Sequence, residues 1–288
     1  MEISVVVPYA GGLELLERQL AALTSGQDFA GDYEVVVSVN SANCDLPPEE
    51  VAAGGSPNFD GGRVRFVPSH AAPGPSGARN VGWRASRGDF VLFCDADDQV
   101  DGSWITQMVA ALTESPVVGG RLEYRLLNEA TRFWDGHVAR DLPVKFQHLP
   151  FAPSCNLGVR REVLLATGGF DESLRTGEDI DFCWRAAYAG FTTAFAPAAL
   201  VHYRLRTQWR AAWRQGFNYG LTDAALLVQH RSKGARRTAL EGLKECAGIA
   251  RALLFAILDF SNVPYLVMRA GNMTGRIVGS YEHRVWAV

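Results

Sequence analysis

Three acidic residues, Asp95, Asp97 and Asp98, follow directly after the apolar run at 90–94. A continuous apolar run of this kind is typical of a strand that is buried on both faces. Because residues two apart in an extended chain share a face, Asp95 and Asp97 can point toward one spot at the carboxyl end of a sheet. Paired carboxylates suit a hard divalent cation, Mg2+ or Mn2+, which can hold a diphosphate. Taken alone, the cluster also fits a solvated acidic turn.

Two further acidic residues, Glu178 and Asp179, precede the helix predicted over 180–189. A carboxylate at the start of a helix can stand free and act as a general base. The alternative is that Asp179 serves only as the N-cap of that helix, and this alternative is favoured when the pair is taken alone.

His202 and Arg79 are the other side chains that could take part in chemistry. His202 follows a short extended segment and can bind a metal through a neutral ring nitrogen, although a single histidine at a strand end is more often structural. Arg79 lies in a segment of small residues, 75–82, which allows a helix to pack closely on a sheet. Its guanidinium either faces a nucleotide or is solvated.

The elements that must position these residues alternate along the first hundred positions. Strand-like runs lie at 3–7, 34–39, 63–67 and 90–94, and helical segments lie at 13–23 and 76–85. This rhythm predicts an α/β fold with a mixed, mainly parallel sheet flanked by helices. Prolines and glycines interrupt the stretch from 47 to 62, with room for a helical turn at 49–53.

The second half is organised differently. Strands are predicted at 117–127, 192–195 and 199–203, helices at 161–167 and 180–189, and a mostly helical segment from 208 to about 258. The region 128–150 is expected to be a loop over the site. We therefore expect a domain over 1–205, with a nucleotide-binding half at 1–100 and an acceptor half at 101–205, followed by a helical C-terminal extension over 206–288.

Composition narrows the class of protein. The chain has 288 residues, of which 48% are hydrophobic and 20% are charged, as in an ordinary globular protein. Its five cysteines are scattered and form no CxxC pair, which argues against a structural zinc site and a disulfide framework. The opening residues do not resemble a signal peptide, and no apolar segment is long enough to span a bilayer. We expect a cytoplasmic protein.

Charge is distributed unevenly. Residues 201–288 hold 13 Lys or Arg and 5 Asp or Glu, an excess of 8 positive charges, while residues 1–200 hold 15 and 26, an excess of 11 negative charges. The acidic body argues against nucleic acid as a partner, and the basic tail permits peripheral contact with the inner membrane face. An apolar stripe at helical spacing runs through Leu240, Leu243, Ala247, Ala250, Leu254 and Ile257. Packing on the body or in a homodimer is favoured for this stripe over contact with a membrane.

Six segments between residues 3 and 220 resemble, in order, the motifs of glycosyltransferase family 2, the inverting enzymes of GT-A fold. The matching segments are Val5-Val6-Val7-Pro8, Ala78-Arg79-Asn80-Val81-Gly82, Asp95-Ala96-Asp97-Asp98, Gly168-Gly169-Phe170-Asp171-Glu172, Gly177-Glu178-Asp179 with the downstream Arg185, and Val201-His202. The resemblance implies a Rossmann-like GT-A domain and transfer of a sugar from a nucleotide diphosphate.

The resemblance also implies roles for individual residues. Asp179 would be the general base that deprotonates the acceptor hydroxyl, and Asp97 would ligate Mn2+ or Mg2+ together with His202. Other residues would bind the two substrates: Pro8, Tyr9, Asn40, Arg79, Asp95, Ala96 and, at the diphosphate, Arg214 for the donor, and Glu178 and Asn156 for the acceptor. The metal would stabilise the departing diphosphate during a single displacement with inversion.

Two segments depart from the family pattern, and both belong to the expected nucleobase pocket. Asn40 stands where the family usually has an aspartate, and Pro8-Tyr9-Ala10-Gly11 replaces the usual Pro-Thr-Tyr-Asn. Asn40 can hydrogen-bond a base but carries no charge, so donors with uridine, thymidine or guanosine remain open. A glycan, a lipid-linked intermediate and a small natural product all remain open as acceptors.

Two other functions are compatible with the same sheet. A sugar-phosphate nucleotidyltransferase typically has a basic, glycine-rich loop after its first strand, whereas the segment 8–13 has two glycines and no basic residue. A non-catalytic module that binds sugar nucleotides or glycans would bind without turnover.

Overall fold

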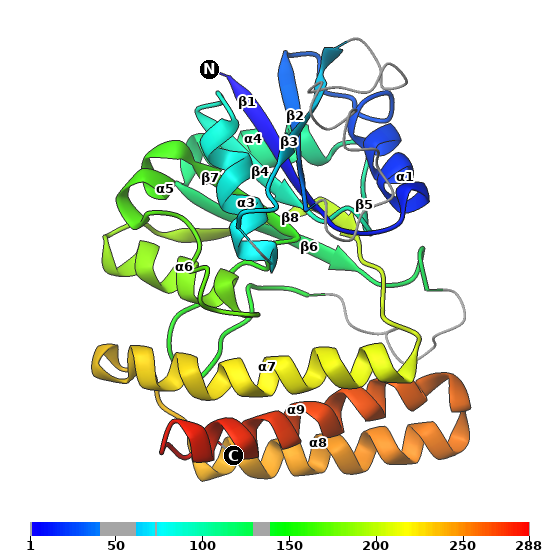
Figure 1. The fold of residues 1–288 in the computed structure, drawn as a ribbon, viewed down its shortest axis with the longest axis vertical. Coiled ribbons are helices and arrows are strands. Elements are labelled where there is room, and N and C mark those ends of the chain that lie inside the picture. Colours follow the sequence, from blue (N-terminus) through cyan, green and yellow to red (C-terminus); the bar gives the residue numbers. More distant parts are fainter. Residues whose placement is uncertain (1, 41–61, 73, 129–138, 288) are drawn as a thin grey trace.

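The computed structural model describes residues 2–40, 62–72, 74–128 and 139–287. The helical turn expected at 49–53 and much of the loop expected at 128–150 lie outside these residues. Within them, eight strands form one sheet with helices on both faces, and three long C-terminal helices form a further layer beneath it (Figure 1). The predicted α/β fold with a mixed, mainly parallel sheet is confirmed.

The sheet has the strand order β3-β2-β1-β4-β7-β6-β8-β5. Strands β1 to β4 are parallel, β7 is antiparallel to β4 and β6, and β8 runs parallel to β6. Because the chain first builds outward from β1 to β3 and then returns to the other side of β1, the order reverses between β1 and β4. Open α/β sheets bind ligands beyond the carboxyl ends of the strands at such a point. The strand bounds are Ile3–Tyr9 (β1), Tyr33–Val39 (β2), Val64–Pro68 (β3), Phe90–Cys94 (β4), Gln99–Val100 (β5), Val117–Glu123 (β6), Asn156–Arg160 (β7) and Thr193–His202 (β8).

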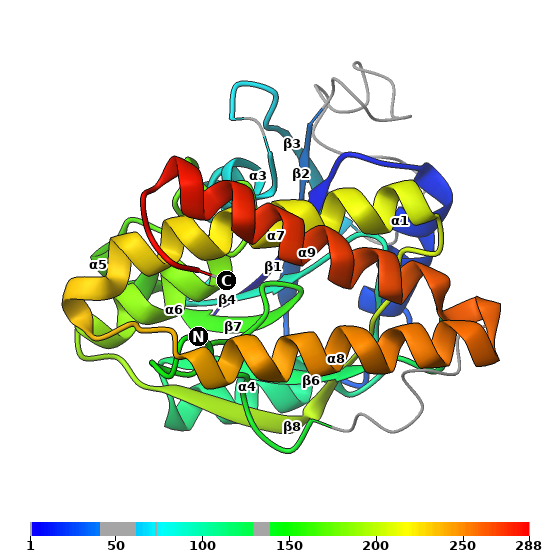
Figure 2. The ribbon, with the colours of Figure 1, turned by 90° about the horizontal axis from the view of Figure 1, so that it is seen from below.

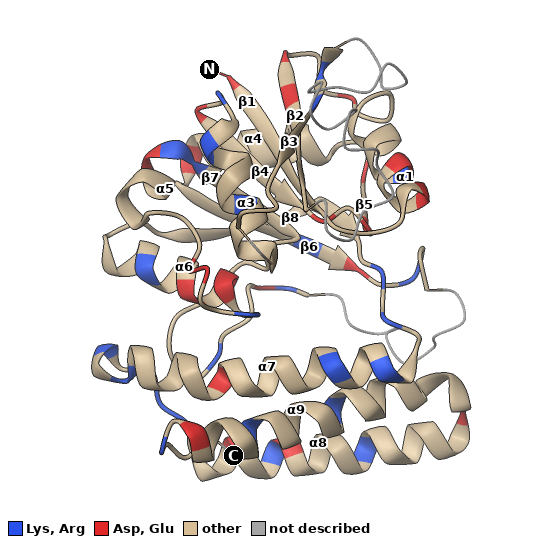
Figure 3. Cartoon of the chain, viewed as in Figure 1, with Lys and Arg blue, Asp and Glu red and all other residues tan. Residues whose placement is uncertain are grey.

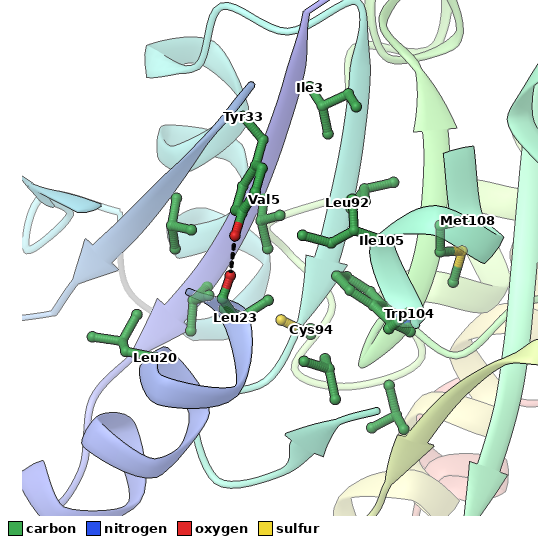
Figure 4. Close-up of a cluster of buried hydrophobic side chains, with 14 of the residues drawn as sticks. Ile3, Val5, Leu20, Leu23, Tyr33, Leu92, Cys94, Trp104, Ile105 and Met108 are labelled. Carbon is green, nitrogen blue, oxygen red and sulfur yellow. Dashed lines mark hydrogen bonds between the residues drawn. The ribbon is translucent and has the colours of Figure 1, made fainter. Parts of the chain in front are cut away.

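Alternating side chains of the sheet enter two hydrophobic cores. Val5 and Val7 pack with α1 (Leu13–Leu23) and α4 (Trp104–Glu114) on one face, where the Tyr33 hydroxyl donates to the Leu23 carbonyl at 2.6 Å (Figure 4). Val6 packs on the other face, where the helices are α3 (Gly74–Ala85), α5 (Arg161–Thr167) and α6 (Glu178–Tyr188). All five residues of β4 are buried, as its apolar run predicts.

Strand β8 is one element where two separate pieces were expected. It pairs with β6 at Gly120 opposite Ala196 and next at Arg121 opposite Leu200, so residues 197–199 are accommodated by an irregularity. Proline cannot donate to a ladder, and an irregularity of this kind lets Pro197 stay within a strand. The prediction of a break was therefore wrong, because the chain bulges here without leaving the sheet.

The C-terminal layer consists of α7 (Trp209–His230), α8 (Ala239–Leu258) and α9 (Val263–Glu282) (Figures 1 and 2). Glycines of α7 face glycines of α9 where the two helices pack together. A Cβ atom added to any of these glycines would meet backbone or side-chain atoms of the other helix. They are Gly216 and Gly220 on α7 and Gly271, Gly275 and Gly279 on α9. The two helix backbones therefore approach closely. Helix α9 lies beyond the helical segment that was expected to end near 258.

Candidate active site

A first cavity of about 400 Å3 opens beyond the carboxyl ends of β1, β2 and β4. Its position at the reversal of strand order is where an open α/β sheet is expected to bind a ligand. Asp97 and Arg206 line it, and so do all the residues predicted to bind the donor except Arg214. The predicted residues that line this cavity are Pro8, Tyr9, Asn40, Arg79, Asp95 and Ala96.

A second cavity of about 690 Å3 lies between the sheet and α7. Glu178 and Asp179 line it from the start of α6, and Arg214 lines it from α7. The two cavities share wall residues, namely Pro75, Arg79, Asp95 and Arg206. A molecule in the first cavity can therefore reach one in the second.

Arg79 joins the two groups of carboxylates that the sequence singled out. Its Nη2 donates to Asp95 at 2.6 Å and its Nη1 donates to Glu178 at 2.8 Å. The side chain is only 3% exposed, so the solvated alternative for this arginine is wrong. Although burial favours the neutral guanidine, Asp95 and Glu178 hold the pKa of Arg79 above its ordinary value. Arg79 is thus a permanent cation between the acidic turn after β4 and the start of α6.

Glu178 is buried and faces both Arg79 and Ser154. Its Oε1 accepts from the Ser154 hydroxyl at 3.2 Å as well as from Arg79. Burial raises the pKa of Glu178 to about 7, against the opposing attraction of Arg79 and with a further contribution from Asp179. Glu178 can therefore change its charge near neutral pH.

Asp179 is the second residue of α6, and the N-cap position belongs to Gly177. The alternative that Asp179 merely caps this helix is therefore wrong. Gly177 has a φ of +70°, a left-handed conformation that favours glycine. The Asp179 carboxylate accepts the N–H groups of Ser154 at 3.2 Å and Ile180 at 2.8 Å. Burial raises its pKa although both hydrogen bonds oppose this, which suits a carboxylate that must take up a proton.

The acidic turn after β4 crowds three carboxylates together. Burial and the negative charge of Asp95 raise the pKa of both Asp97 and Asp98. Asp98 accepts the Arg204 N–H at 2.8 Å through Oδ1, while its buried Oδ2 has no hydrogen-bond partner among the described residues. A divalent cation would relieve this repulsion, so the residues of the turn fit a metal.

One group of possible metal ligands in this region differs from the predicted pair, Asp97 and His202. In the described residues, atoms of Asp95, Asp98 and Cys155 lie within 4.8 Å of one another. Burial raises the pKa of the Cys155 thiol well above its ordinary value, so the two carboxylates are the better ligands of this group. Asp98, which received no role from the sequence, therefore belongs among the candidate ligands.

His202 lies at the end of β8 and contacts Glu123 rather than Asp97. Its Nδ1 is 2.8 Å from Oε2 of Glu123. Carboxylates orient metal-binding histidines in this way and leave the second ring nitrogen to the metal. The contact is compatible with the predicted role of His202 but does not require it.

Asn156 does not lie where the prediction put it. It is fully buried at the start of β7, and it lines neither of the two cavities. Its amide donates to the carbonyls of Arg121 and Ala199 and accepts from the Trp104 indole. Asn156 therefore ties β6, β7, β8 and α4 together, and its burial keeps it out of both cavities.

Sequence reasoning missed Arg206, which lines both cavities. Its Nη2 lies 3.1 Å from Oδ2 of Asp97, and the preceding Arg204 donates through Nε to the Asp97 carbonyl at 2.9 Å. With the Arg204 N–H bond to Asp98, the segment between β8 and α7 is thus attached to the acidic turn by three contacts. Two arginines within four residues of His202 were the available signal, but only the three-dimensional path of the chain shows where they point.

Comparison with known proteins relates the chain to sugar-transferring enzymes. The model of the family described as "Glycosyltransferase like family 2" matches residues 2–218. A pre-mycofactocin glycosyltransferase of Mycobacterium tuberculosis is 29% identical over 246 residues, which are 81% of this chain and 49% of the relative. Glycosyltransferase AglE of Haloferax volcanii is 27% identical over 198 residues, which are 67% of this chain and 64% of the relative. The chain thus spans between about half and two thirds of the length of these relatives.

Solved structures share the fold over nearly the whole chain. A mannosyltransferase from Pyrobaculum calidifontis, solved in complex with GDP-Man and Mn2+, has a TM-score of 0.63 at 18% identity and covers 97% of this chain and 87% of its own. TarS 1–349 of S. aureus in complex with UDP-GlcNAc has a TM-score of 0.54 at 17% identity, over 99% and 93%. At these identities the likeness establishes the GT-A fold alone.

Proposed function

Because the chain belongs to glycosyltransferase family 2, we propose that this transferase moves a sugar from a nucleotide diphosphate to an acceptor hydroxyl with inversion at the anomeric carbon. The observation that carries the proposal is the wall shared by the two cavities, in which Arg79 contacts both Asp95 and Glu178. A donor in the first cavity would present its sugar to a hydroxyl in the second.

The first cavity supplies the groups that a nucleotide needs. Pro8 and Tyr9 line it at the end of β1, and the Asn40 amide can hydrogen-bond a base. Asp95, which accepts a hydrogen bond from Arg79, would accept another from a ribose hydroxyl or would contact the metal. Arg214, on the opposite wall of the second cavity, is exposed and would meet the diphosphate or the acceptor. The related structures hold GDP-Man in one case and UDP-GlcNAc in another, so they support a nucleotide sugar without choosing its base.

The residues around the acidic turn would hold the cation. Asp97 is the proposed ligand with His202, and Asp98 is a further candidate because its Oδ2 has no hydrogen-bond partner in the part of the chain that the structure describes. When bound, Mn2+ or Mg2+ would neutralise the charge of the leaving diphosphate. Arg206, already 3.1 Å from Asp97, would add a positive charge beside the same group.

Asp179 would be the general base. Its carboxylate lines the second cavity and is fixed by two backbone N–H groups. These bonds would hold the carboxylate in place for an acceptor hydroxyl in the cavity, and the raised pKa of Asp179 would help it to take up the proton. Glu178 would help to position the acceptor through its contacts with Arg79 and Ser154.

A thermal-shift screen of nucleoside diphosphates with and without Mn2+ tests the donor side. Binding to the folded state should stabilise it by about 2.7 kcal/mol at a ligand concentration of about 100 times Kd. We expect a Mn2+-dependent rise in Tm with at least one diphosphate. Asp97→Ala should abolish the dependence on Mn2+, whereas Asp32→Ala, an exposed carboxylate outside both cavities, should keep it. No metal-dependent shift with any diphosphate would overturn the donor-site proposal.

A further inference from the structure

The outward face of α8 is apolar along its whole length. The predicted stripe, for which packing in the core or a dimer was favoured, faces away from the rest of the molecule. Its large residues are exposed, and the exposure continues past the end of the helix to Phe260: Leu240 58%, Leu243 67%, Leu254 55%, Ile257 67%, Leu258 72% and Phe260 82%. Exposed apolar patches of this extent mark interaction surfaces.

The inward face of α8 takes up its acidic residues. Ala252 and Ala256 are buried there, and Glu245 pairs with Arg237 and Arg276. Glu241 bonds to Thr238 in a capping box. The exposed charged side chains of α8 are therefore both basic, Lys244 and Arg251, and they lie along one edge of the apolar stripe.

This combination selects one kind of partner. An amphipathic helix with a leucine-rich face and basic residues at its edge is the form that lies in the plane of an anionic lipid surface. Figure 3 shows Lys and Arg on α7, α8 and α9 together with some Asp and Glu. Residues 201–288 carry 13 basic and 5 acidic residues, and several of the basic ones lie in the segments between these helices. A symmetric contact between two copies through this face would bring Lys244 and Arg251 of one copy toward the same residues of the other, whereas anionic headgroups would pair with them. No helix in the described residues is long and apolar enough to cross a membrane.

We infer that the outward face of α8, together with Phe260, docks the protein onto an anionic lipid surface. Phe260 also lines a groove of about 280 Å3 with Pro264, Tyr265 and Met268, between the start of α7 and α9. Met268 and Arg206 belong to both this groove and the second cavity. The groove therefore adjoins the cavity that Asp179 lines, which offers a path for an apolar chain from the docking face. A lipid-linked acceptor would use this path, a consequence that rests on the proposed function, whereas the docking does not.

Sedimentation of the full chain with lipid vesicles tests the docking without any measurement of turnover. We expect binding to vesicles of phosphatidylcholine with phosphatidylglycerol, weaker binding to phosphatidylcholine alone, and a decrease with salt. Leu254→Glu with Ile257→Glu should lower the affinity about tenfold or more, because two exposed side chains lose their apolar burial. Leu165→Glu, a 66% exposed leucine on α5 of the body, is the matched control and should bind like the wild type.

Two results would overturn the inference. One is equal sedimentation of the wild type and the double variant while both show the same helical circular dichroism signal. The other is a homodimer in analytical ultracentrifugation that the double variant abolishes, with no binding to either vesicle. Loss of sugar transfer alone would bear on the proposed function and leave the docking untouched.

Discussion

The Arg79 guanidinium donates to the Glu178 carboxylate at 2.8 Å while its other terminal nitrogen holds Asp95 at 2.6 Å. These two contacts connect α3 with the start of α6 and with the turn after β4. One buried cation thus fixes the distance between the proposed donor site and the proposed base.

Replacing Arg79 should cost both stability and function. Arg79→Gln leaves the buried Glu178 and the partly buried Asp95 without their cation, so we expect the free energy of unfolding in urea to fall by about 3 kcal/mol. Arg84→Gln, on the same helix and 51% exposed, should change it by about 0.5 kcal/mol or less. Similar losses in the two variants would show that the Arg79 bridge does not hold the site together.

The protonation of Glu178 predicts a dependence of stability on pH. Its pKa in the folded state is about 7, above the ordinary value of 4.5, so the folded protein binds more protons than the unfolded chain between these values. The stability from this group is therefore present below pH 4.5 and lost as the pH rises through 7. Glu178→Gln should flatten this part of the curve, measured by urea unfolding across the range. An unchanged slope in the variant would contradict the raised pKa.

Asn156 should act on stability rather than on the acceptor. Asn156→Leu leaves the Trp104 indole and the carbonyls of Arg121 and Ala199 without their partner. We expect a loss of about 2–4 kcal/mol in the free energy of unfolding, with the acceptor KM of the folded fraction unchanged. A stable variant with a raised acceptor KM would restore the role that the sequence suggested.

The glycine contact between α7 and α9 should tolerate no side chain. A Cβ at Gly220 would collide with the backbone of Asn272 and Arg276. Gly220→Leu should therefore destabilise the protein by about 3 kcal/mol or more. Val228→Leu, at a 46% exposed position of the same helix, should be nearly neutral in the same unfolding assay. Equal stability of the two variants would show that the helices do not pack through these glycines.

Much of the fold could be predicted because local patterns and tertiary packing agree there. The apolar run of β4 and the small residues before Arg79 predict a buried strand and a closely packed helix, and both are present. Strand β8 could not be predicted as one element, since Pro197 suggests a break that only the pairing with β6 removes. Helix α9 lies in the expected helical extension but was not predicted as a separate element, because its packing depends on glycines, which lower helix propensity. Their spacing of four residues, Gly271, Gly275 and Gly279, was the available signal.

The site could be predicted in part for a related reason. Asp95, Asp97, Glu178 and Asp179 lie at element ends and Arg79 lies within α3, so the strand and helix pattern fixes their position. All five line one or both cavities. Asn156 and Asp98 depend on long-range hydrogen bonds, to Ala199 in one case and to Arg204 in the other. Such contacts have no local signature, so the sequence assigned Asn156 to the acceptor although it lines neither cavity, and it assigned no role to Asp98.

The stereochemistry of donor turnover by the wild type and Asp179→Asn tests the central claim most directly. Proton NMR of the first sugar released from the donor to water should show the anomeric configuration opposite to that of the donor. Asp179→Asn should slow release by about 10^2–10^4-fold, while its Mn2+-dependent thermal shift with the nucleoside diphosphate stays as in the wild type. Retained configuration, or release by Asp179→Asn at the wild-type rate, would contradict single displacement with Asp179 as the base.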